Sequence, residues 1–491
     1  MTDQLPKSDS NAYKKTFGRD VGKLASGTLI AQIIGFLAYP VITRLFDPSV
    51  YGMFAVFLSL ASIITIISCL RYEQAIFLPK DDHDGGALFH VCLSLVTLVS
   101  LLCIPIFLLL GDGLCELLGE PDLKFWILLV PLTVFIDGTY MALRFWNTRQ
   151  RRFGTQATTQ ALQSVSGAGL KIGFGLLGKI GTGSLIVGQV IGNALGAIIL
   201  AYQAIRLDGA VLKESLSFSR MKKQVIRYKK FPLIDTWSML FHNLSWQLPV
   251  FLLAGFFSPG VAGLYALGHS VIQTPLSLIG GSIGQVFLQR ASEAKRDGTV
   301  GLLIEDVVEL MLLLSLVPLA LLMVYGGDVF ALVFGDEWFE AGVYVQILAI
   351  WAVIWFISSP IGNATSILEI QECRFNYTIA NLITRFAALM IGGYFQSVYL
   401  AMTLFAFFGI LTYGYLFHAI FSHSHASFKK VVYNARKTLA FVVGMMAALA
   451  VLFYVFSVHF YIVLAISVVI ALGYYWILYR FNAKVRSYIP I

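Results

Sequence analysis

Long apolar stretches separated by short polar loops recur about fourteen times along this chain, and they limit what it can fold into. Crossing a hydrocarbon core of about 30 Å takes about 20 apolar residues in a helix. The chain of 491 residues is 58% hydrophobic and only 13% charged, whereas soluble domains are about 25% charged. The sequence therefore predicts an all-α integral membrane protein. The expected spans are residues 24–46, 53–70, 87–110, 125–143, 155–177, 183–205, 232–257, 261–287, 302–325, 344–367, 375–393, 397–421, 438–457 and 459–479.

The basic residues predict the orientation of these spans. Of the 35 Lys and Arg residues, 30 lie in the N-terminal tail, in the loops after even-numbered spans or in the C-terminal tail. Lys and Arg resist translocation and stay in the cytoplasm, so both termini are expected to be cytoplasmic. The five exceptions are Arg44, Lys124, Lys171, Lys179 and Arg385.

The densest basic cluster is the predicted loop Arg206–Lys230. We interpret it first as an orientation signal. Binding to anionic lipid is the alternative, since each such charge gains about 1 kcal/mol at a membrane surface. The net charge of +8 lies on one membrane face and requires no nucleic-acid partner.

Two segments of the chain repeat each other and predict a duplicated architecture. Phe46–Ala55 matches Phe257–Ala266, and both segments follow the first outward crossing of a block of six spans. We expect an N-terminal half over 1–208, a C-terminal half over 209–424 in the same orientation, and two additional spans over 425–491. Parallel repeats of this kind are related by an axis along the membrane normal, with a substrate site between them.

Ionisable residues inside spans are the candidate functional groups. A cation at the bilayer centre costs about 2.5–3.5 kcal/mol on insertion scales, so it faces a cavity or a partner. Lys171 and Arg385 lie in the fifth span of each half and are candidates for one shared cavity. For Lys171, a salt bridge with Asp137 is the alternative. Arg44, at the end of the first span, is the third candidate cation.

Two carboxylates are candidates for coupling transport to an ion. Asp137 lies in the fourth predicted span and Asp235 near the start of the seventh. A desolvated carboxylate favours binding a proton or sodium ion. Asp137 is the stronger candidate because it lies further from the predicted membrane boundary.

Enzymatic and cofactor motifs are not supported by this sequence. Gly173–Lys179 has the spacing G-x-x-x-x-G-K, but Ile180 stands where a phosphate-binding loop needs Ser or Thr. The five cysteines show no metal-ligand spacing. We therefore expect no cofactor, no metal and no enzymatic activity.

Three segments carry a resemblance to a known family: Thr43–Phe54, Leu70–Lys80 and Tyr228–Pro232. With these segments and its fourteen spans, the chain resembles the Wzx-type oligosaccharide flippases of the multidrug/oligosaccharidyl-lipid/polysaccharide exporter superfamily. The resemblance implies alternating-access export of an undecaprenyl-pyrophosphate-linked oligosaccharide across a bacterial inner membrane, for O-antigen lipopolysaccharide, capsule or exopolysaccharide. It also implies a cavity between the halves, often cationic, and allows ion coupling and other polysaccharide assembly proteins as partners.

A physical argument leads to the same class of substrate. An oligosaccharide on a pyrophosphate cannot cross hydrocarbon unaided, because its polar groups would lose their hydrogen bonds. Lys171, Arg385 and Arg44 would give the pyrophosphate charge-assisted partners. Two alternatives stay open: an ion-coupled multidrug or metabolite exporter of the same fold, and a membrane polysaccharide polymerase or ligase. The short external loops expected at 111–124 and 326–343 do not favour an enzyme.

Overall fold

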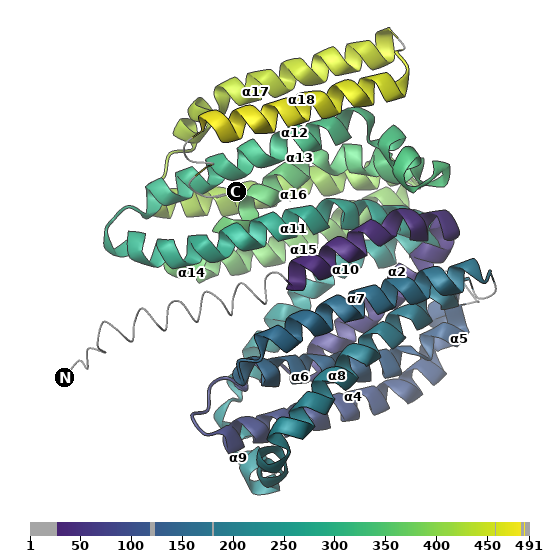
Figure 1. The fold of residues 1–491 in the computed structure, drawn as a ribbon, viewed down its shortest axis with the longest axis vertical. Coiled ribbons are helices and arrows are strands. Elements are labelled where there is room, and N and C mark those ends of the chain that lie inside the picture. The colour runs from purple at the N-terminus through teal and green to yellow at the C-terminus, as the bar shows by residue number, and fades with distance from the viewer. Residues whose placement is uncertain (1–26, 118–122, 179–180, 457, 483–485, 487–491) are drawn as a thin grey trace. The chain divides into compact units, whose positions relative to one another are not determined.

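The computed structural model describes residues 27–117, 123–178, 181–456, 458–482 and 486. The predicted N-terminal tail and the first residues of the first span lie outside this range. Every regular element in the described residues is a helix, which confirms the all-α prediction (Figure 1). Within the described ranges, eleven helices are long and apolar enough to cross a membrane: Gly27–Leu45, α2 (Pro48–Ser68), α4 (Asp82–Leu117), α5–α6 (Leu123–Arg149), α8 (Thr182–Ser215), α11 (Pro259–Arg296), α12 (Val300–Phe334), α13 (Phe339–Ile361), α16 (Val398–Ser424), α17 (Phe428–Ala450) and α18 (Phe460–Phe481).

Three more helices fill the remaining predicted spans but are less apolar: α7 (Phe153–Leu176), α10 (Thr236–Phe256) and α15 (Gln371–Tyr394). Each carries several amides or charged residues along its length. A polar membrane helix has to turn these groups toward protein or a water-filled cavity. The three helices therefore indicate where polar interior surfaces lie.

Contacts divide the described chain into two units, one ending at Gly263 and the other beginning at Leu264. In the first, α4, α6 and α8 pack around Trp146 and Phe89. In the second, α12 packs against α13 and α17, and α18 joins the same apolar core (Figure 1). This grouping does not test the predicted duplication, and the boundaries at 208 and 424 stay a prediction.

The repeated sequence segments start α2 and α11 in the same way. Asp47 accepts hydrogen bonds from the backbone N–H groups of Ser49 and Val50, both at 2.9 Å. At the matching position before α11, the Ser258 hydroxyl accepts from the Val261 N–H at 3.3 Å. A proline opens each helix, where its missing N–H costs no hydrogen bond. The matching residues are therefore helix-capping signals.

The glycines of the two repeated segments let these helix starts pack against each other. A Cβ on Gly52 would overlap the carbonyl oxygen of Pro259, and a Cβ on Gly263 would overlap that of Pro48. All four residues lie in the first unit. Both glycines lie inside helices, at a crossing where only a hydrogen atom fits.

Several helices extend beyond their predicted ends. The loop expected at 326–343 is largely helical: the backbone of α12 is non-helical at Tyr325, where the span was expected to end, but a helical segment continues to Phe334 and a short 3₁₀ turn, Asp336–Trp338, precedes α13. The loop expected at 206–230 contains the end of α8 and a separate helix, α9 (Phe218–Arg227). Hydropathy locates the hydrocarbon-facing part of a helix, but its backbone hydrogen bonding continues into water.

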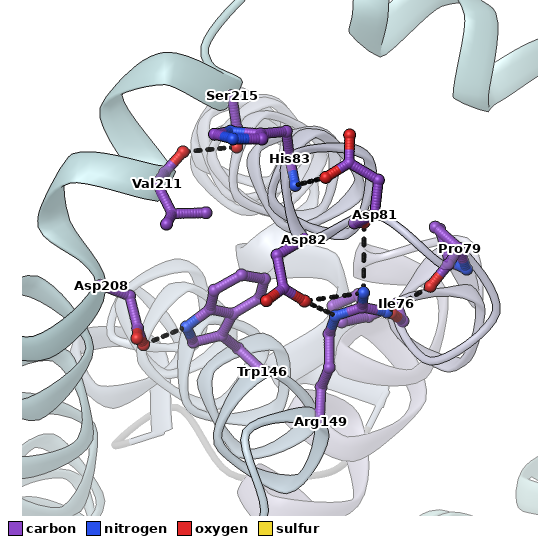
Figure 2. A network of polar contacts seen from close by, with 10 residues as sticks. All are labelled: Ile76, Pro79, Asp81, Asp82, His83, Trp146, Arg149, Asp208, Val211 and Ser215. Atoms are coloured by element: carbon purple, nitrogen blue, oxygen red, sulfur yellow. Dashed lines mark hydrogen bonds and ion pairs between the residues drawn. The ribbon is translucent and has the colours of Figure 1, made fainter.

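Polar contacts fix the segment that follows α2, within the motif Leu70–Lys80. Arg149, in the last turn of α6, donates to the carbonyl oxygens of Ile76, Pro79 and Asp81 at 2.7, 2.9 and 3.1 Å (Figure 2). It also binds the Asp82 carboxylate, with its Nη2 at 2.8 Å. One guanidinium thus holds four successive parts of this connection.

A second group of contacts ties α6 to α8 beside this segment. The indole of Trp146 donates to the Asp208 carboxylate at 2.9 Å (Figure 2). Arg152 binds both oxygens of the same carboxylate at 2.6 Å. Such bidentate pairs add geometric specificity as well as energy. These contacts hold α6 against α8 beside the segment that Arg149 fixes.

Glu73, in the same motif, makes stability depend on pH. Burial raises the pKa of its carboxyl above the ordinary 4.5, although Arg71 lies 3.2 Å away and opposes this. A raised folded-state pKa favours the neutral acid. The contribution of Glu73 to stability is therefore complete below pH 4.5. It is lost as the pH rises through the raised pKa of the folded state.

We expect the Glu73→Gln protein to melt at a higher temperature than the wild type at pH 8. The two should converge near pH 4.5, because Gln mimics the neutral acid. Thermal unfolding of the detergent-purified protein across this pH range measures the difference. Glu214→Gln, with a side chain that is 69% exposed, is the control. Parallel melting curves for Glu73→Gln and wild type would contradict the assignment.

Candidate functional site

A polar cavity of about 410 Å³ lies within the first unit, lined by the helix Gly27–Leu45, α6, α7 and α8. Its lining includes the five amide side chains Gln32, Gln160, Gln163, Gln189 and Asn193. Four hydroxyl groups join them, from Thr28, Tyr39, Tyr140 and Ser164. Lys171 is the one Lys or Arg in this lining. The cavity is thus rich in neutral hydrogen-bonding groups and carries a single cation.

Glycines on α8 let α7 approach closely enough to form one wall. A Cβ on Gly188 would lie 2.8 Å from Cγ of Lys171, and one on Gly192 would lie 2.9 Å from the Cα of Gly167. Residues four apart share a helix face. The small residues therefore fix where the α7 side chains stand, including that of Lys171.

A chain of hydrogen bonds joins Lys171 to Asp137. The Lys171 ammonium donates to Gln189 at 2.5 Å, and the Gln189 amide donates to Asn193 at 3.0 Å. Asn193 in turn donates to the Asp137 carboxylate at 2.7 Å. The salt bridge considered from the sequence is not the arrangement found: in the described structure two amides separate the opposite charges.

Two further contacts involve the residues of this hydrogen-bond series. Gln163 also donates to the Asn193 oxygen, at 2.7 Å. The Lys171 ammonium lies 4.9 Å from the centre of the Phe54 ring, within the range of a cation–π interaction. Lys171 is thus held by Gln189 and Phe54 while it lines the cavity.

Arg385 lies in the second unit, on α15, and only 1% of it is exposed. Its guanidinium carbon is 5.1 Å from the centre of the Phe405 ring and 5.8 Å from that of Trp351. Trp351 stacks on Trp355, which stacks on His269. The structure therefore gives this cation an aromatic enclosure. The cavity that it was predicted to share with Lys171 stays a prediction.

The structure places Arg44 and Asp235 away from the cavity lining. Arg44 is exposed near the end of its helix. Asp235, at the end of a π-helical turn (Phe231–Asp235), accepts from Arg71 at 2.9 Å. Asp235 thus has a fixed cationic partner, whereas Asp137 bonds a neutral amide.

The amides of the cavity are not among the residues predicted from the sequence, because neutral amides do not stand out in a count of charged residues. The signal was present: Gln156, Gln160 and Gln163 recur at helical spacing on α7, one of the less apolar helices. Gln32 has no comparable pattern around it.

Comparisons with known proteins agree on the class of this chain. A family model described as polysaccharide biosynthesis protein matches residues 41–343. The chain is 22% identical to the lipopolysaccharide biosynthesis protein WzxC of Escherichia coli, over 75% of this chain and 73% of that protein. It is also 22% identical to the succinoglycan biosynthesis transport protein ExoT of Rhizobium meliloti, over 68% of this chain and 66% of that protein.

Solved structures share the fold. The lipid II flippase MurJ in an inward closed conformation aligns with a TM-score of 0.71 and 12% identity, over 93% of this chain and 98% of that one. A point mutant of the Vibrio cholerae MATE transporter VcmN aligns with a TM-score of 0.52 and 15% identity. That alignment covers 87% of this chain and 99% of VcmN. At these identities the likeness shows the fold.

Proposed function

This chain belongs to the polysaccharide biosynthesis protein family, and we propose that it moves a lipid-linked oligosaccharide between the leaflets of a bacterial inner membrane. The proposed substrate is an undecaprenyl-pyrophosphate-linked repeat unit. The two halves would open alternately to the cytoplasm and the periplasm. The similarity to WzxC, named for lipopolysaccharide biosynthesis, and to ExoT, named for succinoglycan transport, supports this class of substrate.

The observation that carries the proposal is the cavity around Lys171. Polar cavities between membrane helices are costly and mark pathways for polar substrates. This cavity offers one cation for an anionic group and many neutral donors and acceptors for hydroxyl groups. A lipid-linked oligosaccharide carries both kinds of group, joined at one end.

Within this proposal, Lys171 is the principal partner of the pyrophosphate. Its charge acts in a poorly screened cavity, where a cation matters more than at an exposed surface. Arg385 and Arg44 are proposed as further cations that the substrate meets in other conformations. Asp137 is proposed as the ion-coupling acid, because a proton or cation bound there would act on Lys171 through Asn193 and Gln189. Asp235 is the second such candidate.

The orientation is tested by labelling single cysteines in intact cells. In a background with the five native cysteines replaced, we expect Glu337→Cys, in the short turn before α13, to react with an impermeant maleimide. Lys222→Cys, on α9, is expected to react only after the cells are opened. Labelling of Lys222→Cys in intact cells, with Glu337→Cys protected, would show that the orientation is the opposite of the one proposed.

The function itself is tested by complementation. In a strain lacking its own flippase gene, the chain should restore surface polysaccharide and relieve accumulation of the lipid-linked precursor. Export of small cations without any effect on the precursor would instead favour the multidrug exporter. Elongation of polymer by the purified protein would favour a polymerase.

A further inference from the structure

We propose that the amide-lined end of the cavity recognises the first sugar next to the pyrophosphate, and so selects substrates by their glycan. The inference rests on the proposed function and deepens it. It assigns the sugar to Gln32, Gln160 and Gln163, and the pyrophosphate to Lys171.

The chemistry of the lining matches a sugar. A hydroxyl group both donates and accepts hydrogen bonds, and so does a carboxamide. Five carboxamides face this one cavity, together with hydroxyl groups from three helices. A cavity built only to attract an anion would gain more from additional cations. The cation present here is also linked to Asp137, which reduces its excess positive charge.

Gln32 supplies an independent indication of a ligand. Its side-chain oxygen is shielded from solvent and has no hydrogen-bond partner among the described residues. An unsatisfied buried acceptor is costly, so its presence calls for a function. The oxygen belongs to a side chain that lines the cavity. A rotation of this side chain toward the cavity would let a hydroxyl of a bound sugar provide the missing donor.

The helix that carries Gln32 is held against α7 beside these amides. The Thr28 hydroxyl donates to the Gln160 oxygen at 2.7 Å, and Ser164 donates to the Ala31 carbonyl oxygen at 2.7 Å. Both contacts hold these side chains in place beside the cavity. The amide end is therefore preorganised, which lowers the entropy lost on binding.

The two ends of the cavity are far enough apart to hold different parts of one substrate. Gln163 and Lys171 are eight residues apart on α7, or about 12 Å along the helix axis, and Gln160 is about 16 Å from Lys171. A pyrophosphate at Lys171 would thus place the attached glycan along the helix toward Gln163 and Gln160. The lipid tail would leave from the opposite side of the pyrophosphate.

Binding measurements on the purified full-length chain test this assignment. The probes are undecaprenyl pyrophosphate and the same lipid carrying one hexose, N-acetylhexosamine or uronic acid. We expect at least one glycosylated lipid to bind wild type about tenfold more tightly than the sugar-free lipid, the effect of one to two additional hydrogen bonds. In Gln32→Met/Gln160→Met, this preference should fall to nearly onefold while sugar-free binding is unchanged.

Matched variants separate the possible results. Gln203→Met, on α8 and outside the cavity, should keep the preference. Lys171→Gln should weaken the binding of all probes to the same extent. If the double variant cannot be purified, Gln32→Met alone should lower the preference about threefold.

A preference that survives in the Met variants, or no preference in wild type, overturns the sugar assignment but not the proposed function. Absence of binding by every lipid overturns the proposed function and, with it, this inference.

Discussion

Lys171→Ala should abolish most transport at normal protein levels. A charge-assisted hydrogen bond contributes about 1.5–3 kcal/mol, so losing the cation should slow transport about tenfold to a hundredfold. The measurement is the surface polysaccharide made by a strain that depends on this chain. Lys171→Arg keeps the charge and should retain partial transport, limited by the close approach of Gly188 to the lysine side chain.

The control for this variant is another lysine of the first unit. Lys124 has a side chain that is 64% exposed, and it pairs with Asp112 at 2.8 Å outside the cavity. Lys124→Ala should leave transport near the wild-type level, since exposed pairs contribute little. Full polymer from Lys171→Ala would exclude this residue as the principal anion site. Arg385 or Arg44 would then be the cations to examine.

The second large effect is expected at the crossing of α2 and α11. Gly263→Ala places a methyl group on the Pro48 carbonyl oxygen, and Gly52→Ala places one on that of Pro259. Overpacking costs about 1–3 kcal/mol, and an overlap with backbone at a close helix crossing should reach the upper part of this range. Each variant should melt well below the wild type in detergent and accumulate poorly in membranes.

A second glycine of α11 provides the matched control. A Cβ on Gly281 would meet no atom within 4 Å. Gly281→Ala should therefore be neutral, or stabilise the helix by up to about 1 kcal/mol through its higher helix propensity. Equal melting temperatures for Gly263→Ala and Gly281→Ala would contradict the proposed role of the close crossing.

Hydropathy and charge were sufficient to predict the helical membrane fold, because bilayer thickness restricts both the length and the composition of a span. They did not predict the helix ends. The backbone of α12 breaks at Tyr325, the expected end of the span, but a second helical segment continues to Phe334, since helical hydrogen bonding is not obliged to stop at the hydrocarbon boundary. The repeated segments were recognised, but the helix crossing that requires Gly52 and Gly263 depends on tertiary structure.

The candidate site was predicted only in part. Lys171 stood out because cations are rare in membrane helices, and the structure places it in a cavity. A direct pair with Asp137 was the alternative considered from the sequence, whereas Gln189 and Asn193 stand between the two residues. Such a chain joins residues of three helices, so no spacing along the sequence reveals it. The aromatic surroundings of Arg385 likewise come from three other helices.

The most direct measurement is transfer of a lipid-linked oligosaccharide across vesicles that contain only this protein. An undecaprenyl-pyrophosphate-linked repeat unit is loaded in one leaflet, and its appearance in the other is followed with an enzyme or lectin that cannot enter the vesicle. We expect transfer with the wild type, about tenfold to a hundredfold slower transfer with Lys171→Ala, and near-normal transfer with Lys124→Ala. Wild-type transfer no faster than in protein-free vesicles would contradict the proposed function.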